Sequence, residues 1–575
     1  MRISTITFAV IALLASTPAS AQIADWRGLA TENWFNDVNW NPEAIPAAGI
    51  NVIIDTTSPN PTTLAGAATP SLGAVQVGPS GTGDLLIELG GKLNNNGIGI
   101  LGTQPDSLGF VTIRDAGSEW RIDNNLVVGE QGAGLLQLRS SGYLLNNNAR
   151  IGNSASGFGA ASVWSGSNWV SLGNLFVAHS GSGSLDIRGG DSAVFNQAQA
   201  FVGYAGGGEG SVRVRQGGGW ASFADVFIGR EGQGKLDIES GGVVVVTSDS
   251  SSFVGALPGG AGEVTVTGPG SRWTTTASLI VGVSGNGQLD VANGGEVTAD
   301  ILSIGDLETG VGAVTVGEDA VLSSDNDILV GRLGSGSLFI EGGEVNSGRF
   351  GLIGNDPGGF GEVHLTASAR WTSQESVFVG NFGSGVLTIG PDAELISGGG
   401  VRVSTVPGGS ARLDLSGSLT ANAARGGTQV DGGGLLRGTG LIDGGLTVRG
   451  LGFVAPGLDP GEIGELQVSR LNMDSVDAVL RIDLGPPPIS DRIIVSGDVI
   501  LNGLLHASDA GGFAPGVYTL ITYTGTLTDS GLAIDLLPPL PPGYGAWIDT
   551  STQPGEVRLV IDELSDEVFS DRFEI

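Results

Sequence analysis

The chain has 575 residues but no cysteine, and its only histidines are His179, His364 and His506. Without thiols it can form no disulfide scaffold, no cysteine–zinc site and no thiol nucleophile. Three histidines far apart in the sequence also argue against a multi-histidine metal site. We therefore expect no metal and no cofactor, and a fold held together by apolar burial and backbone hydrogen bonds.

Positive charge is scarce as well. Lysine and arginine together number 26, aspartate and glutamate 59, and the formal net charge is −33 at pH 7. The only lysines are Lys92 and Lys235. Phosphate is bound by clustered cations, so this composition argues against nucleic acid and anionic membranes as partners. Acidity of this kind is more typical of a soluble surface than of one specific partner.

The first residues have the pattern of an export signal. Arg2 supplies a positive charge, Ile6 to Ala15 is an apolar run, and Ala19-Ser-Ala21 is a small-residue cleavage site. We predict a signal peptide over residues 1–21. The apolar run is too short to span a bilayer, and no later segment is suited to do so. The mature chain is therefore expected to be exported and to have no transmembrane segment.

Aromatic residues make up only 6% of the chain and glycine is abundant, at 101 residues. Such a composition can indicate disorder, but 40% of the residues are hydrophobic and they follow a strict pattern. An apolar–any–apolar triplet occurs in fourteen copies, 24 to 28 residues apart, between Leu85 and Leu415. Self-similarity at this period predicts a solenoid.

One copy shows what each repeat should form. Leu279-Ile-Val-Gly282, Leu289-Asp-Val291 and Glu296-Val-Thr298 each alternate with period two, which is strand geometry, and glycines separate them as turns. Three short strands and three turns describe one coil, whose inner face is buried only when coils stack. We predict an all-β fold, a right-handed parallel β-helix with a cap at each end.

A seven-bladed β-propeller is the alternative fold. Two copies pair into a unit of 49 to 53 residues marked by a tryptophan, and propeller blades have repeats near that length. The two halves of each unit resemble one another, which argues for the β-helix. The predicted segments are an N-terminal aromatic cap over 22–70, a solenoid over 71–425, a C-terminal β region over 426–562 and an acidic tail over 563–575.

Motifs in three parts of the chain carry a family resemblance. They are Val264-Thr-Val-Thr-Gly-Pro-Gly-Ser-Arg-Trp273, Leu279-Ile-Val-Gly282 and Gly287–Gly295 in the repeats; Trp26-Arg-Gly28, Asn33-Trp34, Asn39-Trp40 and Pro46 near the start; and Pro456-Gly-Leu-Asp-Pro-Gly461, Asp491–Gly497 and Leu501-Asn-Gly-Leu504 near the end. These resemble the passenger proteins of autotransporters. That family ends in a translocator barrel, whereas only the acidic tail follows here, so the resemblance implies a separate secretion partner and a passenger-like region over 426–562.

The middle residue of each triplet should point outward and form a column along the rod. In this column Asp186, Arg213 and Asp237 fall on successive coils as an acid–base–acid ladder. Such a ladder could serve a polysaccharide-cleaving enzyme, or it could be a surface ion-pair ladder of small energetic weight. The chemistry of the column varies freely, which favours a solvated face. The column reads Leu86, Thr112, Gln137, Ser162, Asp186, Arg213, Asp237, Thr265, Asp290, Thr315, Phe339, His364, Thr388 and Asp414.

The tryptophans of the paired units offer a second candidate surface. A row of indoles could stack sugar rings, or each tryptophan could cover the turn of its coil; we favour the second interpretation. The candidate glycan-stacking residues are Trp120, Trp169, Trp220, Trp273 and Trp371.

Together these features predict an exported bacterial β-solenoid that is not an enzyme and that lies at the outer-membrane surface or outside the cell, the periplasm being the remaining address. We expect a structural or adhesive role, in which a repeated face makes multivalent contacts with glycans or surface proteins. The alternative function is a carbohydrate-active enzyme, a polysaccharide lyase or hydrolase.

Overall fold

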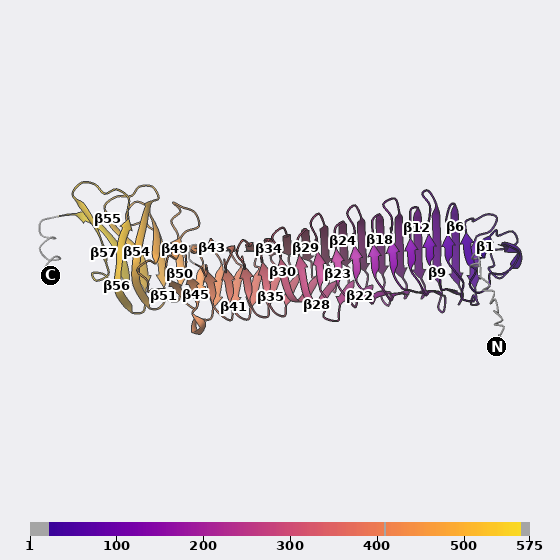
Figure 1. The fold of residues 1–575 in the computed structure, drawn as a ribbon. Helices are drawn as coiled ribbons and strands as arrows, with labels where there is room; N and C mark the ends of the chain where they lie inside the picture. The colour runs from indigo at the N-terminus through magenta and orange to yellow at the C-terminus, as the bar shows by residue number, and fades with distance from the viewer. Residues whose placement is uncertain (1–21, 407–409, 565–575) are drawn as a thin grey trace, which may run out of the picture.

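The computed structural model describes residues 22–406 and 410–564, and it shows a long rod of stacked coils (Figure 1). The predicted signal peptide and the tail beyond Leu564 lie outside the described residues. In the described chain 58 strands form one continuous sheet system, with two 3-10 turns, Asp37–Asn39 and Ala423–Arg425, and no α-helix. The strands of each coil pair in parallel with those of the next, so the predicted parallel β-solenoid is confirmed and the propeller is excluded.

Each coil contributes one strand to each of three parallel sheets. The first sheet contains β4 (Thr62–Ala65), β6 (Thr82–Glu88), β9 (Leu108–Arg114), β12 (Ala133–Arg139), β15 (Phe158–Trp164), β18 (Ser182–Arg188), β21 (Glu209–Arg215), β24 (Gln233–Glu239), β27 (Ala261–Thr267), β29 (Asn286–Ala292), β31 (Val311–Val316), β34 (Ser335–Glu341), β37 (Phe360–Thr366), β40 (Ser384–Ile389), β43 (Ala411–Leu415), β46 (Leu435–Gly438), β49 (Phe453–Pro456) and β52 (Val479–Leu484).

The second sheet contains the four-residue strands that follow the turn after each first-sheet strand. These are β7 (Lys92–Asn95), β10 (Glu119–Ile122), β13 (Tyr143–Asn146), β16 (Asn168–Ser171), β19 (Ala193–Asn196), β22 (Gly219–Ser222), β25 (Val243–Val246), β32 (Val321–Ser324), β35 (Glu344–Ser347), β38 (Arg370–Ser373), β41 (Glu394–Ser397), β44 (Ser418–Ala421), and then β47 (Leu441–Asp443), which is shorter, β50 (Glu465–Val468) and β53 (Arg492–Val495).

The third sheet is built from short strands and begins at the first described residues. Its strands are β1 (Ile23–Trp26), β3 (Asn51–Ile54), β5 (Val75–Val77), β8 (Gly99–Leu101), β11 (Leu126–Val128), β14 (Ala149–Ile151), β17 (Leu175–Val177), β20 (Ala200–Val202), β23 (Val226–Ile228), β26 (Ser252–Val254), β33 (Ile328–Val330), β36 (Gly351–Ile353), β39 (Val377–Val379), β42 (Val401–Val403), β45 (Thr428–Val430), β48 (Leu446–Val448) and β51 (Leu471–Met473). Two longer strands, β28 (Arg272–Val281) and β30 (Glu296–Ile304), run through both the second and the third sheet.

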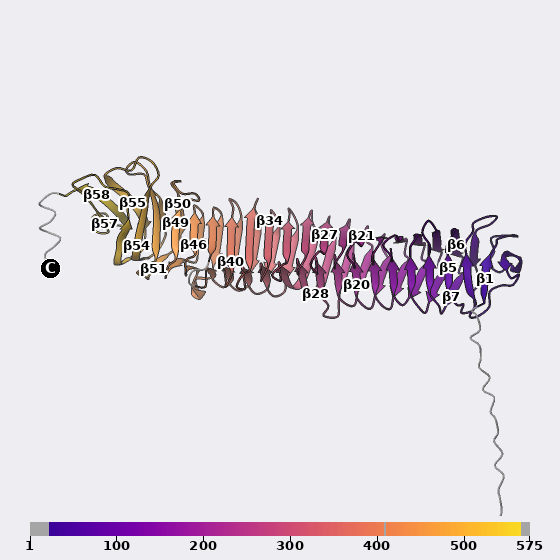
Figure 2. The ribbon, with the colours of Figure 1, turned by 45° about the horizontal axis from the view of Figure 1, so that its top comes forward.

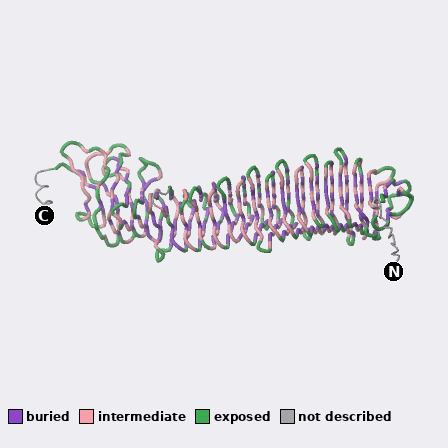
Figure 3. The backbone as a smooth tube through the Cα atoms, viewed as in Figure 1, coloured by how far each residue is buried: buried purple, intermediate pink, exposed green. Residues whose placement is uncertain are grey.

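A continuous apolar core runs through the inside of the coils. Along most strands buried and more exposed residues alternate, as period two requires (Figure 3). The second residue of many first-sheet strands is an inward-facing glycine, because the coil turns tightly there: a Cβ added at Gly234 would lie 2.3 Å from the carbonyl oxygen of Val202. Stacking therefore depends on both the aliphatic side chains and these glycines.

The two-coil unit seen in the sequence has a structural basis in the turns that lead into the first sheet. The turn between β20 and β21 covers residues 203–208, whereas the next one, between β23 and β24, covers only 229–232. Long and short turns alternate in the same way around it, at 255–260 and 282–285. The tryptophan of each unit belongs to the coil that follows a long turn.

Parallel stacking extends beyond the segment 71–425 predicted for the solenoid. At the N-terminus β1 already pairs in parallel with β3, and Trp26, Trp34 and Trp40 are buried with their rings edge to face at centroid distances of 4.8–5.0 Å. The short strand β2 (Trp40–Asn41) pairs antiparallel with β1. These three rings form a buried aromatic cluster at the N-terminal end of the rod.

At the other end the last coils widen into a β cap (Figure 2). The strands β54 (Val499–Asp509) and β56 (Leu527–Leu536) still pair in parallel, whereas β58 (Glu556–Glu563) pairs antiparallel with β55 (Gly516–Tyr523) and β57 (Tyr544–Asp549). The buried Asp491 carboxylate accepts the backbone N–H groups of Gly464 and Asp483 at 2.7 and 2.8 Å. In the described residues no helix has the length and apolarity needed to cross a membrane.

Candidate functional site

The outward face of the first sheet carries the predicted column of middle residues. Cα pairing places Leu86 opposite Thr112 and continues in register, one residue per coil, as far as Asp414. The predicted column is therefore confirmed. Neighbouring members lie about 4.8 Å apart along the rod, the spacing of hydrogen-bonded strands.

The acid–base–acid ladder of Asp186, Arg213 and Asp237 is brought together, but its ion pairs are not the simple ones expected. Arg215, on the same strand as Arg213, holds Asp186 through Nε–Oδ1 and Nη2–Oδ2 contacts of 3.0 and 3.2 Å. Arg213 instead approaches Asp237 at 3.8 Å and Glu239 at 3.7 Å. Because Arg215 holds Asp186 in a bidentate ion pair, Asp186 is not free to act on a substrate as a base.

Asp237 is the carboxyl group of the ladder that lies between two cations. Burial raises its pKa, and the opposing charges of Lys235 and Arg213 lower it less. The Lys235 ammonium lies 3.7 Å from Asp237 and also pairs with Glu263. The coil spacing puts Asp186 and Asp237 about 10 Å apart, at the outer limit for the paired carboxyls of glycosidases, which span about 5–9.5 Å.

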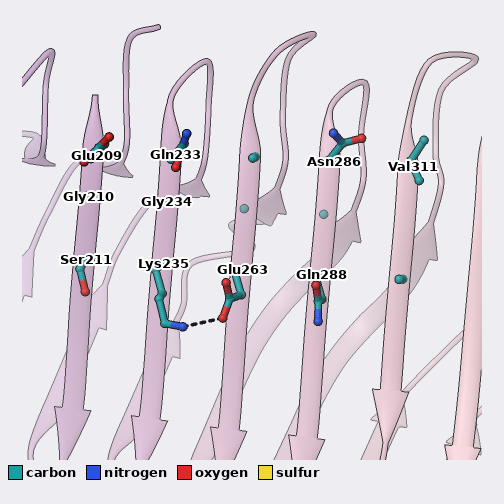
Figure 4. A pocket seen from close by; sticks show the side chains of 14 residues that line it. Glu209, Gly210, Ser211, Gln233, Gly234, Lys235, Glu263, Asn286, Gln288 and Val311 are labelled. Carbon is teal, nitrogen blue, oxygen red and sulfur yellow. Dashed lines mark hydrogen bonds and ion pairs between the residues drawn. The ribbon is translucent and has the colours of Figure 1, made fainter. Parts of the chain in front are cut away.

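A shallow groove of about 640 Å³ lies on the same sheet, nearer the beginning of its strands, and crosses β21, β24, β27, β29 and β31 (Figure 4). Glycines at the inward second strand position form part of its lining, and polar side chains stand on either side of them. The polar side chains are Glu209, Ser211, Gln233, Lys235, Glu263, Asn286 and Gln288. The sequence prediction missed this groove, although its signal is present: over five copies the first and third strand residues are mostly short or polar.

The five tryptophans are not on the surface. Each faces inward as the second residue of a second-sheet segment and is 0–1% exposed. Their burial contradicts the hypothesis that they stack sugar rings, and they fill the interior rather than cover a turn. The physical reason is strand parity: Trp273 pairs with Val244 and Val297, which are both core residues. The residues concerned are Trp120, Trp169, Trp220, Trp273 and Trp371.

A row of stacked phenylalanines lies on the third sheet and was not predicted. Phe176, Phe201, Phe227 and Phe253, which we call the phenylalanine lane, are the middle residues of four successive third-sheet strands. Their rings stack at centroid distances of 4.9, 5.0 and 4.7 Å with interplanar angles of 12–14°. A recurrence every 25 or 26 residues is the signal that reveals them. The ring faces are used within the stack, and Phe227 and Phe253 are partly exposed whereas Phe176 and Phe201 are buried.

One end of the phenylalanine lane is covered by turn residues. Tyr204 stands edge-on to Phe176 and Phe201 at 5.1 and 4.9 Å, and stacks on His179 at 4.9 Å. Burial, and then the nearby Arg150, lower the pKa of His179.

In residues 22–406 and 410–564 no three histidine, aspartate or glutamate side chains are placed to hold a metal ion.

Comparisons with known proteins agree with the architecture. No protein-family model matches the chain. It is similar to the uncharacterised lipoprotein YdeK of Escherichia coli K12, with 30% identity over 309 residues, which is 42% of this chain and 23% of that protein. It is also similar to the adhesin BmaC autotransporter of Brucella suis, with 34% identity over 112 residues, which is 18% of this chain and 3% of that protein. The chain thus spans less than a quarter of either relative, and the similarity accords with an exported or cell-surface β-solenoid.

Proposed function

We propose that this chain is an exported, non-enzymatic rod that adheres to surface glycans or proteins through weak contacts repeated along its length. The observation that carries the proposal is the register of the first sheet, which holds its outward side chains in straight columns from coil to coil. A rigid column makes each further contact intramolecular, so that modest affinities multiply. The partial similarity to an autotransporter adhesin supports the same role.

An adhesion assay with the mature chain tests this function. Beads carrying residues 22–575 at increasing density are added to immobilised bacterial cells, host matrix proteins and polysaccharides, and retention under flow is measured. Retention should rise steeply with the density of chains on each bead, because avidity depends on simultaneous contacts. Retention no greater than that of bare beads at every density and on every surface would refute an adhesive role.

The carbohydrate-active enzyme remains the second candidate function, and the environment of Asp237 is the observation that favours it. Burial raises the pKa of the Asp237 carboxyl, as a general acid requires, and the cations Lys235 and Arg213 lie 3.7 and 3.8 Å from it. Incubating the chain with a panel of polysaccharides and assaying reducing ends and unsaturated sugars decides between the two. We expect no release; release by the wild type that Asp237→Asn abolishes would establish the enzyme.

A further inference from the structure

The groove on the first sheet has a shape that selects an extended ligand. It runs along the rod across five neighbouring strands, and each strand contributes two outward residues, one from its first and one from its third position (Figure 4). A ligand lying in it therefore meets a new pair of side chains about every 4.8 Å. A linear polymer matches this arrangement better than a compact molecule does.

The groove also contains polar side chains that are free to bind. Within the described chain, Glu209, Ser211, Gln233 and Asn286 make no side-chain hydrogen bond, while Lys235 is engaged by Glu263. The amides of Gln233 and Asn286 can each donate and accept hydrogen bonds, and the hydroxyl of Ser211 can as well. Such groups complement hydroxyl groups, which also donate and accept hydrogen bonds.

Charge and apolar contacts narrow the ligand class further. The groove carries two carboxylates against one lysine that is already paired, on a chain of net charge −33, so an anionic polymer is repelled. Ala261, Val311 and Ala313 supply small apolar patches for C–H surfaces. An added peptide strand finds no free backbone, because β24 is paired with β21 on one side and β27 on the other.

We infer that this groove binds a neutral oligosaccharide lying along the rod. The inference rests on the proposed adhesive function and names its ligand class and its site. Gln233 and Asn286 act as the polar contacts on the two sides of Ala261, which sits opposite both of them in the sheet.

Three variants test the site. Gln233→Ala with Asn286→Ala removes the two amides. Ala261→Phe fills the groove, and the fold should tolerate it because Phe158 and Phe360 occupy the same strand position in other coils. The matched control is Gln467→Ala with Asn168→Ala, which removes the same two residue types at outward positions of the second sheet, away from the groove.

Binding is measured by biolayer interferometry on the mature chain, with neutral gluco- and manno-hexaoses, with alginate and hyaluronan oligomers, and with an uncharged hexapeptide. We expect at least one neutral hexaose to bind, a tenfold or greater loss in both groove variants, no change in the control, and no dependence on salt. The proposal is overturned if no neutral hexaose binds, if both groove variants bind as the wild type does, or if only the anionic oligomers or the peptide show the loss. Beads that still adhere in the flow assay, while both groove variants leave adhesion and hexaose binding unchanged, would refute this site and leave the adhesive function standing.

Discussion

Two of the buried tryptophans differ in whether the indole N–H donates a hydrogen bond. The indole N–H of Trp220 donates to the amide oxygen of Asn196 in the preceding coil at 2.8 Å, inside the core. Trp273 stands in the same position two coils later, but the corresponding residue of its preceding coil is Val246, and its indole N–H has no partner among the described residues. The chain therefore contains both the satisfied and the unsatisfied form of one arrangement.

Exchanging the two forms gives opposite effects of predictable size. Asn196→Val strands the Trp220 N–H in an apolar core and should cost about 1–3 kcal/mol of unfolding free energy. Val246→Asn gives Trp273 an acceptor and should gain about 0.5–1.5 kcal/mol. The new amide group also has donors to satisfy, and Thr275, which pairs with position 246 as Ser222 pairs with Asn196, offers Oγ1 as an acceptor.

The measurement must resolve single coils, because a solenoid is coupled mainly between neighbours and can open locally. Hydrogen exchange followed by mass spectrometry on peptides covering 219–228 and 272–281 reports these coils, and urea unfolding followed by tryptophan fluorescence reports the whole rod. Asn168→Val is the control, since Asn168 faces outward on the same sheet and should change stability by less than about 0.5 kcal/mol. If Asn196→Val exchanges no faster than Asn168→Val, the indole hydrogen bond contributes nothing and the reasoning fails.

Three further predictions concern the cap, the lane and the coil corner. Burial raises the pKa of Asp491 to about 7, so the folded cap binds this proton more tightly than the unfolded chain does. The stability of the cap should therefore fall as the pH rises from 3.8 towards 7. Asp491→Asn should remove this part of the pH profile of urea midpoints, and an unchanged profile would contradict the assignment. Phe227→Ala breaks two ring stacks and should lower the unfolding free energy by about 1–3 kcal/mol. Phe158→Ala, at a half-exposed and unstacked ring, should change it by no more than about 0.5 kcal/mol. Equal urea midpoints for the two variants would disprove a role for stacking. Gly234→Ala drives a Cβ against the carbonyl of Val202 and should lower the unfolding free energy by about 3 kcal/mol or more. The urea transition should then be lost or occur at a much lower urea concentration. Wild-type stability of this variant would show that the backbone around Gly234 can relax.

Much of the fold follows from two periods in the sequence. The period of two decides which side chains point inward along a strand, and the period near twenty-five decides which residues meet on neighbouring coils. Together they are enough to place Asp186 opposite Arg213 and Arg213 opposite Asp237, as the structure does. The partners of these charges were not predictable, because the choice of Arg215 by Asp186 depends on rotamers of long side chains at the surface.

The same parity, applied more strictly, would have placed the tryptophans correctly. Arg272-Trp273-Thr274 aligns with Glu296-Val-Thr298 of the next coil, which puts the indole on the parity of a core valine. The interpretation as a sugar-stacking row followed the chemistry of the indole rather than its position. The groove is different, since its shape depends on side chains from five strands at once, and no single repeat contains it.

The separation between a uniform interior and a variable exterior bears directly on how function can be distributed along this rod. Most inward positions hold aliphatic residues, glycine or tryptophan, and the inward end of several second-sheet strands holds a buried asparagine or serine, because each coil must match the two that cover it. Outward positions carry no such constraint, so that Thr265, Phe339 and His364 can share one column without disturbing the stack. Since each coil contacts mainly its neighbours, a change on the outer face of β24 to β29 should leave distant coils unaffected. A loss of binding in the groove variants, together with wild-type unfolding, would therefore report on the ligand contacts themselves.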